Sequence, residues 1–451
     1  MEERTYFETV QELLESRQYT SLRQYLTELN IADIAVCMDE LTDEDELKVF
    51  RILPKDLAAE VFAYLEVENQ QMIITSLTDK EAAGIINNLM ADDAVNLLEE
   101  MPASVVKKLL AHATAGVRND INHLLRYPED SAGSLMTVEY VDLKEHLTVN
   151  QAIERIRKVG VDRATINICY VLDGHRKLIG TVSLRRLLLS GADQLISEIM
   201  HENVVAINTL MDQEEVANQF KKYDFTSMPV VDNENRLVGI ITVDDVVDIL
   251  EEEATEDMEK MAAIMPSDKS YMRTSVWENY KKRIPWLLLL MVSSAFTGAI
   301  ITSFETALSV NAALIAFIPM LMGTGGNAGG QASVTVIRGL SMGEIEYRDV
   351  GKVIWKEIRV ALLCGICLAA ANFIKLMLID RCGLLVAASV SLTLVIVVLM
   401  AMFIGCILPV AAKRIGLDPA VMASPFITTI VDALSLLIYF RVAALMLGIS
   451  V

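Results

Sequence analysis

The stretch AVMASPFITTIVDALSLLIYFRVAALML (residues 420–447) decides the fold, because it is long and apolar enough to span a bilayer yet carries Asp432 near its middle. A carboxylate at bilayer depth costs roughly 2.5–3.5 kcal/mol on insertion scales, so it normally faces a polar interior or a water-filled path. Thr428, Asp432 and Ser435 share one face at helical spacing, and Thr429 lies beside them. The stretch predicts a helix that presents oxygen atoms to a cation. The alternative is a protonated or hydrogen-bonded aspartate that joins helices.

Four more apolar stretches of similar length precede this one, which predicts five membrane spans within residues 281–451. The five candidates are Pro285–Leu308, Val310–Val336, Val360–Leu378, Leu384–Ala412 and Ala420–Leu447. Nearly all basic residues that flank them fall on one side, and only Lys375 and Arg381 fall on the other. We therefore expect a multi-pass protein of the cell membrane with a cytoplasmic N-terminus and an external C-terminus. Glu305 is expected at the outer end of the first span, as a solvated helix end or as a charge at the pore mouth.

The second candidate span is unusual because it contains PMLMGTGGNAGGQ (residues 319–331), with five glycines and one proline. Irregular backbone at membrane depth is tolerated only where it is buried in protein or lines a cavity. Asn327 and Gln331 are four residues apart, on one face of a helix. We expect this span to line a pore through Asn327 and Gln331, while close helix packing at Gly323, Gly326 and Gly330 is an equally good interpretation.

Charge and composition restrict the partners. The chain has 451 residues and a net charge of −21, but residues 281–451 carry 13 Lys and Arg against 8 Asp and Glu, so residues 1–280 carry −26. An acidic surface of this kind argues against nucleic acid and favours cations. All five histidines precede residue 281, and magnesium prefers carboxylate, carbonyl and water oxygens to imidazole or thiolate. The transported ion is therefore expected to be a hard cation such as Mg²⁺.

Residues 1–130 contain a short internal repeat. Ala35, Ala59 and Ala83 occupy equivalent positions, as do Phe50, Ile74 and Leu98. Each unit reads as a short helical hairpin, and stacked hairpins bury a continuous core, so an acidic α-helical solenoid is predicted. Its turns carry acids such as Asp92 and Asp93, which are either solvated or form an ion-sensing surface.

A second duplication follows in residues 131–249, with copies at about 131–195 and 196–249. YVLDGHRKLIGTVSLRR (residues 170–186) aligns without gaps with PVVDNENRLVGIITVDD (residues 229–245), and each copy predicts a β-hairpin that leads into a helix. The pair resembles tandem CBS domains, which frequently hold an adenine nucleotide such as ATP. That resemblance assigns Thr242 and Asp245 to nucleotide binding. The first copy has Ser183 and Arg186 at these positions, so an equivalent second site is not expected.

An acid-rich helix is predicted from Asp244 to Glu259, and it leads into the connecting segment, residues 250–280, between the duplicated domain and the membrane. Asp245, Asp248, Glu252, Glu256 and Glu259 recur every three or four residues, so their carboxylates form one repulsive stripe. Divalent ions would relieve the repulsion, which favours a role in gating. The alternative is a plain solvated linker.

The order of these parts resembles the bacterial MgtE magnesium channels over essentially the whole chain. The motifs that carry the resemblance are Pro319 with GNAGGQ (residues 326–331), EATED (residues 253–257) and PFITTIVD (residues 425–432). The resemblance implies a homodimer whose pore is formed by the second and fifth spans, with Asp432 binding hydrated magnesium. It also implies closure by cytosolic magnesium at acidic residues of the N domain, CBS domains and plug helix. Carried over by position, these are Asp92, Asp93, Asp244, Asp248, Glu252, Glu253, Glu256 and Asp257.

The fold predicted from the sequence is therefore multidomain: an α-helical solenoid N domain, α/β tandem CBS domains, a connecting plug helix and a transmembrane domain of five helices, residues 281–451. The expected function is magnesium-gated magnesium uptake rather than enzymatic catalysis. A divalent ion gains about 4.6 kcal/mol from a potential of about 100 mV, so no ATP-hydrolysing motif is required. A cation-coupled Mg²⁺ exchanger and a non-conducting membrane sensor are the alternatives.

Overall fold

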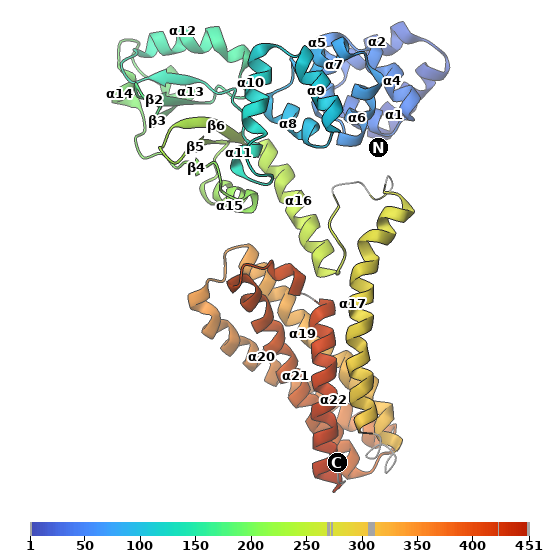
Figure 1. The fold of residues 1–451 in the computed structure, drawn as a ribbon. Helices are drawn as coiled ribbons and strands as arrows, with labels where there is room; N and C mark the ends of the chain where they lie inside the picture. The colour runs from blue at the N-terminus through green and yellow to red at the C-terminus, as the bar shows by residue number, and fades with distance from the viewer. Residues whose placement is uncertain (1, 268–270, 272–273, 305–311, 423, 449–451) are drawn as a thin grey trace. The chain divides into compact units, whose positions relative to one another are not determined.

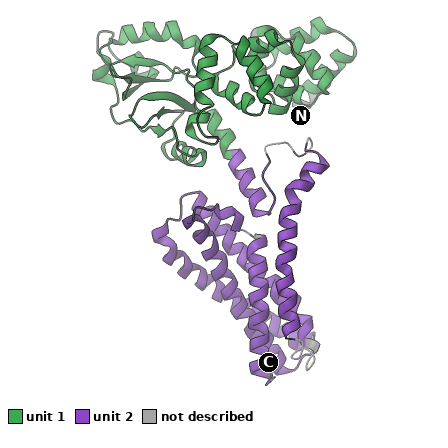
Figure 2. Cartoon of the chain, viewed as in Figure 1, with its two compact units in different colours: residues 1–250 green, residues 251–451 purple. Residues whose placement is uncertain are grey.

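The computed structural model describes residues 2–267, 271, 274–304, 312–422 and 424–448 (Figure 1). The chain divides into two compact units, residues 1–250 and residues 251–451, each described by itself below (Figure 2). Glu305 and the start of the second candidate span lie outside the described residues.

The first unit begins with ten short helices. They are α1 (Glu2–Glu15), α2 (Tyr19–Glu28), α3 (Ile31–Asp39), α4 (Asp43–Ile52), α5 (Lys55–Ala63), α6 (Val67–Ser76), α7 (Asp79–Ile86), α8 (Ala91–Glu99), α9 (Ala103–His112) and α10 (Ala115–Leu124). Helices α3, α5, α7 and α9 start at Ile31, Lys55, Asp79 and Ala103, so the starts are evenly spaced along the chain. The predicted solenoid of helical hairpins is confirmed, and α9 with α10 supplies a fourth pair in the same register.

The repeat has this form because equivalent positions are buried in every pair. Val49, Ile73, Leu97 and Ile121 occupy the same position in successive pairs, and all four are fully buried in one continuous core. Helix starts are capped locally. Thr78, for example, forms a capping box with Glu81 at α7, which satisfies backbone donors at the helix end. Stacking rather than individual helix propensity therefore stabilises these short helices.

Two similar α/β copies complete the first unit. Their elements are α11 (Ala132–Leu135), β1 (Asp142–Lys144), α12 (Val149–Val159), η1 (Gly160–Asp162), β2 (Ile168–Leu172), β3 (Leu178–Ser183), α13 (Leu184–Leu189), α14 (Ile196–Ile199), β4 (Ile207–Asn208), α15 (Gln213–Tyr223), β5 (Ser227–Val231) and β6 (Leu237–Thr242). Each copy is a three-stranded sheet, β1-β2-β3 or β4-β5-β6, with one parallel and one antiparallel pair. The two hairpins have the same register: Ile168 pairs with Ser183 in the first, and the aligned residues Ser227 and Thr242 pair in the second.

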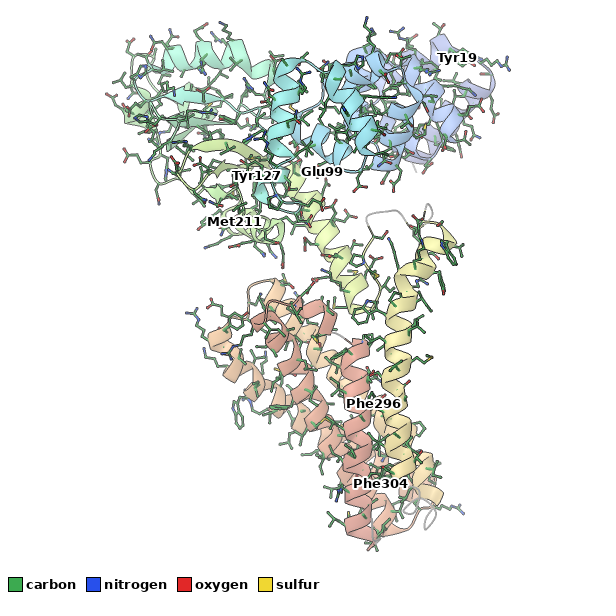
Figure 3. All side chains as sticks on the ribbon, in the orientation of Figure 1. Tyr19, Glu99, Tyr127, Met211, Phe296 and Phe304 are labelled. Atoms are coloured by element: carbon green, nitrogen blue, oxygen red, sulfur yellow. The ribbon has the colours of Figure 1, made fainter. Side chains whose placement is uncertain are left out.

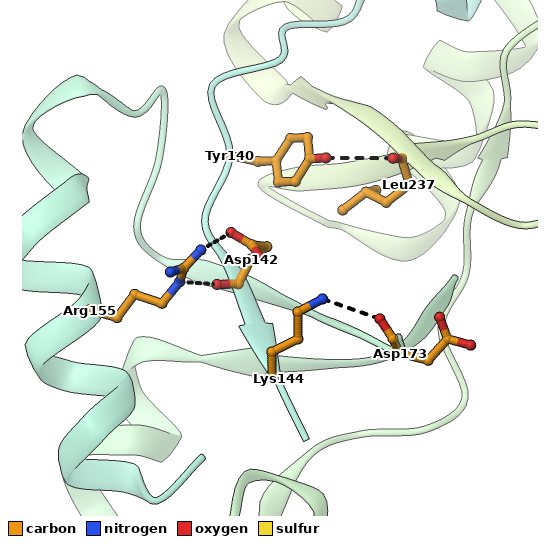
Figure 4. Close-up of polar contacts among 6 residues, drawn as sticks. All are labelled: Tyr140, Asp142, Lys144, Arg155, Asp173 and Leu237. Atoms are coloured by element: carbon orange, nitrogen blue, oxygen red, sulfur yellow. Dashed lines mark hydrogen bonds and ion pairs between the residues drawn. The ribbon is translucent and has the colours of Figure 1, made fainter. Parts of the chain in front are cut away.

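Direct hydrogen bonds join the two copies. The hydroxyl of buried Tyr170 lies 3.0 Å from the Ser227 hydroxyl, and the Tyr140 hydroxyl donates to the Leu237 carbonyl in the other copy (Figure 4). Within the first copy, Arg155 binds Asp142 through its guanidinium group, which fixes α12 against β1. The tandem CBS architecture is thereby confirmed.

Helix α16 (Val243–Met261) begins in the first unit and ends in the second, whose other elements are mostly long helices. These are α17 (Val276–Ser303), η2 (Ala312–Phe317), α19 (Ile318–Ser341), η3 (Tyr347–Asp349), α20 (Val350–Leu378), α21 (Leu384–Arg414), η4 (Pro419–Met422) and α22 (Ser424–Leu447). Helix α21 packs against α19, α20 and α22, and α17 packs on α22. Phe304, the residue after α17 (Figure 3), stacks on Phe440 of α22.

Four helical segments in the described residues are long and apolar enough to cross a membrane: Val276–Ser303, Tyr347–Leu378, Leu384–Arg414 and Pro419–Leu447. They match the first, third, fourth and fifth predicted spans. The second predicted span corresponds to α19, a helix of 24 residues that is not among the four. Its glycine-rich stretch is a continuous α-helix, so the expected irregular backbone was wrong. The count of five crossings stays a prediction.

Candidate ion path and regulatory surface

The glycines of α19 allow it to lie very close to α22. A Cβ atom on Gly325 would lie 2.9 Å from Val431 and 3.0 Å from the Ser435 hydroxyl, and one on Gly326 would lie 2.9 Å from Thr428. Gly329 faces Ile427 in the same way. Such approach requires residues without side chains, since a Cβ at these distances would force the helices apart. The packing interpretation is therefore confirmed at Gly326 and was wrong at Gly323, where nothing lies within 4 Å, while Gly325 and Gly329 supply close contacts that the sequence reasoning did not single out.

The same helix also meets α21 through glycine. Gly405 of α21 lies against the backbone of Gly329, where an added Cβ would overlap the Gly329 carbonyl oxygen. The glycine backbone of α19 thus packs closely on side chains of α22 and on the backbone of α21, which fixes the orientation of α19 about its own axis. Asn327 and Gln331 both lie on the exposed face of α19, as their spacing predicts.

Asp432 is partly exposed, and its two carboxylate oxygens differ. Oδ1 is buried and has no hydrogen-bond partner among the described residues. The neighbouring Thr429 hydroxyl donates to the Pro425 carbonyl at 3.1 Å within its own helix. A buried carboxylate oxygen without a protein donor is costly unless a cation or water satisfies it, so the Asp432 carboxylate has the chemistry of a hard-cation ligand.

The predicted stripe on α22 is divided by the packing of α19. Thr428 and Thr429 are partly exposed, as Asp432 is, but Ser435 is 0% exposed and lies against Gly325. In the single chain the Ser435 side chain therefore belongs to the interface between α19 and α22. Sequence spacing places residues on one face, but it does not decide which end of that face another helix covers.

A group of acidic side chains comes together in the first unit. Asp92 and Asp93 begin α8, and Asp244 and Asp245 begin α16. Burial raises the pKa of Asp92 well above its usual range, and the charges of Asp93 and Asp245 raise it further. Burial and the charges of Asp245 and Asp244 raise the pKa of Asp93 to about 7. Carboxylates in this arrangement repel one another when ionised, so an added cation would stabilise it.

Asp245 lies in this group and also contacts Thr242, its predicted nucleotide-binding partner. The Thr242 hydroxyl donates to Asp245 Oδ2 at 2.6 Å. Burial raises the pKa of Asp245, although the hydrogen bond from Thr242 acts to lower it. The contact closes the first turn of α16, so Thr242 and Asp245 also have a structural role as a helix cap. In the first copy, the Arg186 amide donates to Ser183 at 3.2 Å in the equivalent cap.

The remaining acids of α16 are arranged differently. Asp248 and Glu252 are exposed, Glu253 is partly buried, and Glu256 pairs with Lys260 at 2.6 Å. Burial raises the pKa of Asp257, and the charge of Asp418 raises it further. Within the described ranges, no three His, Cys, Asp or Glu side chains are already arranged to hold a metal ion.

Sequence reasoning missed three charged residues at these surfaces: Glu139, Lys260 and Asp418. The charge of Glu139 raises the pKa values of Asp92 and Asp93, and Lys260 binds Asp418 across 158 residues of sequence. No local motif marks any of them. Lys260 is, however, the one basic residue within the acid-rich run that ends α16, which is a signal the sequence does contain.

Comparison with known proteins agrees with this architecture. Family models match residues 29–130 as the MgtE intracellular N domain, residues 132–192 and 196–252 as CBS domains, and residues 318–442 as an MgtE divalent cation transporter. The magnesium transporter MgtE of Thermus thermophilus is 38% identical over 97% of this chain and 98% of its own length. The magnesium transporter MgtE of Bacillus subtilis is 34% identical over 96% of this chain and 95% of its own length.

Two solved structures resemble about half of this chain. The soluble part of a magnesium transporter has a TM-score of 0.53 and 30% identity, over 56% of this chain and 99% of that one. The cytosolic domain of the Mg²⁺ channel MgtE in complex with ATP has a TM-score of 0.52 and 38% identity, over 54% of this chain and 99% of that one.

A solenoid, a CBS pair and a bundle of long apolar helices that carries Asp432 define a multi-pass membrane transport protein. The chain belongs to the MgtE family, and the resemblance inferred from its motifs is confirmed. The family is one of divalent cation transporters and not of enzymes.

Proposed function

We propose that this protein is a magnesium channel that takes Mg²⁺ into the cytoplasm and closes when cytoplasmic magnesium is high. The observation that carries the proposal is the buried, unpartnered Oδ1 of Asp432 within the described part of an apolar helix. Mg²⁺ dehydrates reluctantly and prefers oxygen ligands, so one carboxylate would hold the ion through its bound water. Entry is driven by the membrane potential, at about 2.3 kcal/mol per elementary charge for a potential of about 100 mV.

The proposed path uses α19 and α22 of two chains. Asn327 and Gln331 on the exposed face of α19 supply amide groups, and Thr428, Thr429 and Asp432 supply oxygens from α22. In a homodimer both copies of Asp432 would share the ion. Ser435 supports the path indirectly, because it is buried where α22 meets Gly325. The proposed orientation keeps the N-terminus cytoplasmic and the C-terminus external, within the cell membrane.

Closure is proposed to depend on the acids of α8 and α16. Asp92 and Asp93 face Asp244 and Asp245, so bound Mg²⁺ would reduce a repulsion that otherwise separates the two helices. The carboxylate-only donor set suits Mg²⁺ rather than a soft metal. Asp248, Glu252, Glu253, Glu256 and Asp257 are the further proposed regulatory ligands along α16. The equilibrium shifts because the ion binds one state more tightly than the other.

ATP or another adenine nucleotide is the proposed second regulator. Its support is the CBS pair together with the related cytosolic domain that binds ATP. Thr242 and Asp245 are the residues assigned to it. Because Asp245 also lies in the acidic group, nucleotide and magnesium would act on the same end of α16.

The test is magnesium flux into proteoliposomes that contain wild type or Asp432→Asn. The substitution keeps the shape of the side chain and removes the charge, so flux should fall at least tenfold, as removal of an ion's main ligand would require. Asp380→Asn is the matched control. Asp380 lies just beyond the end of α20 and pairs with Lys375 in the last turn of that helix, so this substitution should leave flux unchanged. Wild-type flux in Asp432→Asn would refute the proposed path.

The same vesicles separate the alternatives. A channel carries magnesium without a sodium or proton gradient, whereas an exchanger needs one. Absence of flux under all gradients and at low magnesium would instead support the non-conducting sensor.

A further inference from the structure

The C-terminal end of α16 holds a lysine among three acids of the second unit. Lys260 Nζ lies 2.6 Å from Asp418 Oδ2 and 2.6 Å from Glu256 Oε1. The charge of Asp418 also acts on Asp257, which raises the pKa of that residue. The Lys260 side chain is only 22% exposed, so this ion pair is screened less by solvent than a surface pair.

Asp418 uses its two oxygens for two different segments. Oδ2 accepts from Lys260, while Oδ1 accepts from the Ala420 amide at 2.8 Å in η4. Because η4 leads directly into α22, one carboxylate joins the end of α16 to the start of the helix that carries Asp432. The two segments are distant in sequence, since Lys260 and Asp418 are 158 residues apart.

An apolar contact lies next to the ion pair. Met261 packs against Ile337 of α19 and fully buried Ala420 of η4. The chain after α16 is held as well, because the Met265 amide donates to the Lys282 carbonyl of α17 at 3.2 Å. The end of α16 and the residues that follow it thus touch α17, α19 and η4 within one compact unit.

Lys260 supplies a positive charge within the acidic group at the end of α16. Burial acts to lower its pKa, but the hydrogen bonds to Asp418 and Glu256 outweigh burial and raise the pKa to about 12. The Lys260 ammonium group lies between Asp418 and Glu256, where it partly neutralises the local carboxylates. This distinguishes the end of α16 from its start, where Asp244 and Asp245 lie beside the acids of α8.

We propose that Lys260 is a positioning residue. Its ion pair with Asp418 holds the end of α16 to η4, so that changes at the acidic start of α16 reach α22. This inference rests on the proposed function in that α22 carries the ion path. Magnesium would act on the acidic residues of α16, while the lysine keeps the C-terminal end of the helix attached to η4. Without the attachment, closure would require more magnesium.

The test measures how flux into proteoliposomes depends on cytoplasmic magnesium for Lys260→Met, Lys260→Arg and Asp418→Asn. Lys260→Met and Asp418→Asn should each raise the half-closing concentration roughly three- to tenfold, with flux at low magnesium unchanged, as loss of one coupling contact predicts. Lys260→Arg should restore closure. The double variant should shift no further than either single variant, because both remove the same interaction. Lys352→Met is the matched control, since its pair with Asp349 is on the surface, where the lysine is 84% exposed.

Closure of Lys260→Met at the same magnesium concentration as wild type would overturn the inference. Additive effects of Lys260→Met and Asp418→Asn in the double variant would overturn it as well. Loss of flux at low magnesium with an unchanged melting temperature would also overturn it, because Lys260 would then belong to the path itself. Hydrogen exchange gives a readout that does not depend on transport. The Ala420 amide should exchange faster in Lys260→Met than in wild type, even if Asp432→Asn shows that the proposed path is wrong.

Discussion

The carboxylates of Asp432 and Asp93 have contrasting surroundings. Asp432 has one buried oxygen that no described group satisfies, whereas Asp93 is surrounded by other carboxylates. The first arrangement suits an ion passing through, because a carboxylate that holds the ion through its bound water binds it weakly enough to release it. The second arrangement is unfavourable without a counterion and therefore suits a sensor, since its stability depends on what is bound.

Protonation should replace magnesium in stabilising the acidic group of the first unit. The pKa of Asp93 is about 7 in the folded chain against the ordinary value of 3.8, so the folded state binds the extra proton between these values. Stability in a chelator should consequently be highest near pH 4 and fall as the pH rises to about 7, by a few kcal/mol at most. The measurement is the melting temperature of the full chain in detergent at several pH values. Asp93→Asn should flatten this dependence, and an equally steep curve in that variant would contradict the assignment.

At the scale of elements, glycine decides how α19 packs. Gly325, Gly326 and Gly329 place its backbone against α22, and Gly405 places α21 against the same helix. The residues that the sequence marks as unusual for a membrane helix are therefore those that allow close packing on two sides. This packing leaves the face with Asn327 and Gln331 exposed.

Gly405→Ala should weaken the bundle because its Cβ would overlap the Gly329 carbonyl oxygen, a backbone atom that cannot rotate away. Overpacking of this kind costs roughly 1–3 kcal/mol, so the melting temperature should fall by several degrees. Gly298→Ala on α17 is the control, because nothing lies within 4 Å of that position. There the higher helix propensity of alanine should leave stability equal or slightly increased. Equal losses in both variants would show that the close contact is not the cause.

For the whole molecule, α16 is the element shared by both compact units, with Asp244 and Asp245 at its start and Lys260 near its end. A continuous helix is stiff, so a change at one end can affect the other without a chain of small rearrangements. The regulation proposed above needs only that magnesium bind one arrangement of its acidic start more tightly.

Removal of magnesium from the full-length protein should speed hydrogen exchange at the beginnings of α8 and α16. The ionised acids repel without a counterion, so these turns should open more often. Exchange in chelator and in millimolar-order magnesium is compared by mass spectrometry. In Asp92→Asn/Asp93→Asn the difference should shrink, while the α1–α2 region, far from the acids in sequence, serves as the internal reference. A magnesium effect of wild-type size in the double variant would place the sensor elsewhere.

The sequence by itself determined the repeating and linear features of this protein. The solenoid repeat, the duplicated hairpins, the long apolar stretches and the isolated Asp432 all follow from local patterns, because helix and strand burial repeats at fixed spacing. The tertiary structure alone decided that Ser435 is covered by Gly325, that Asp92 meets Asp245, and that Lys260 binds Asp418. These contacts join segments far apart in the chain. The cost of closing a long loop changes little with its length, so sequence spacing gives such pairs no preference, and packing selects them.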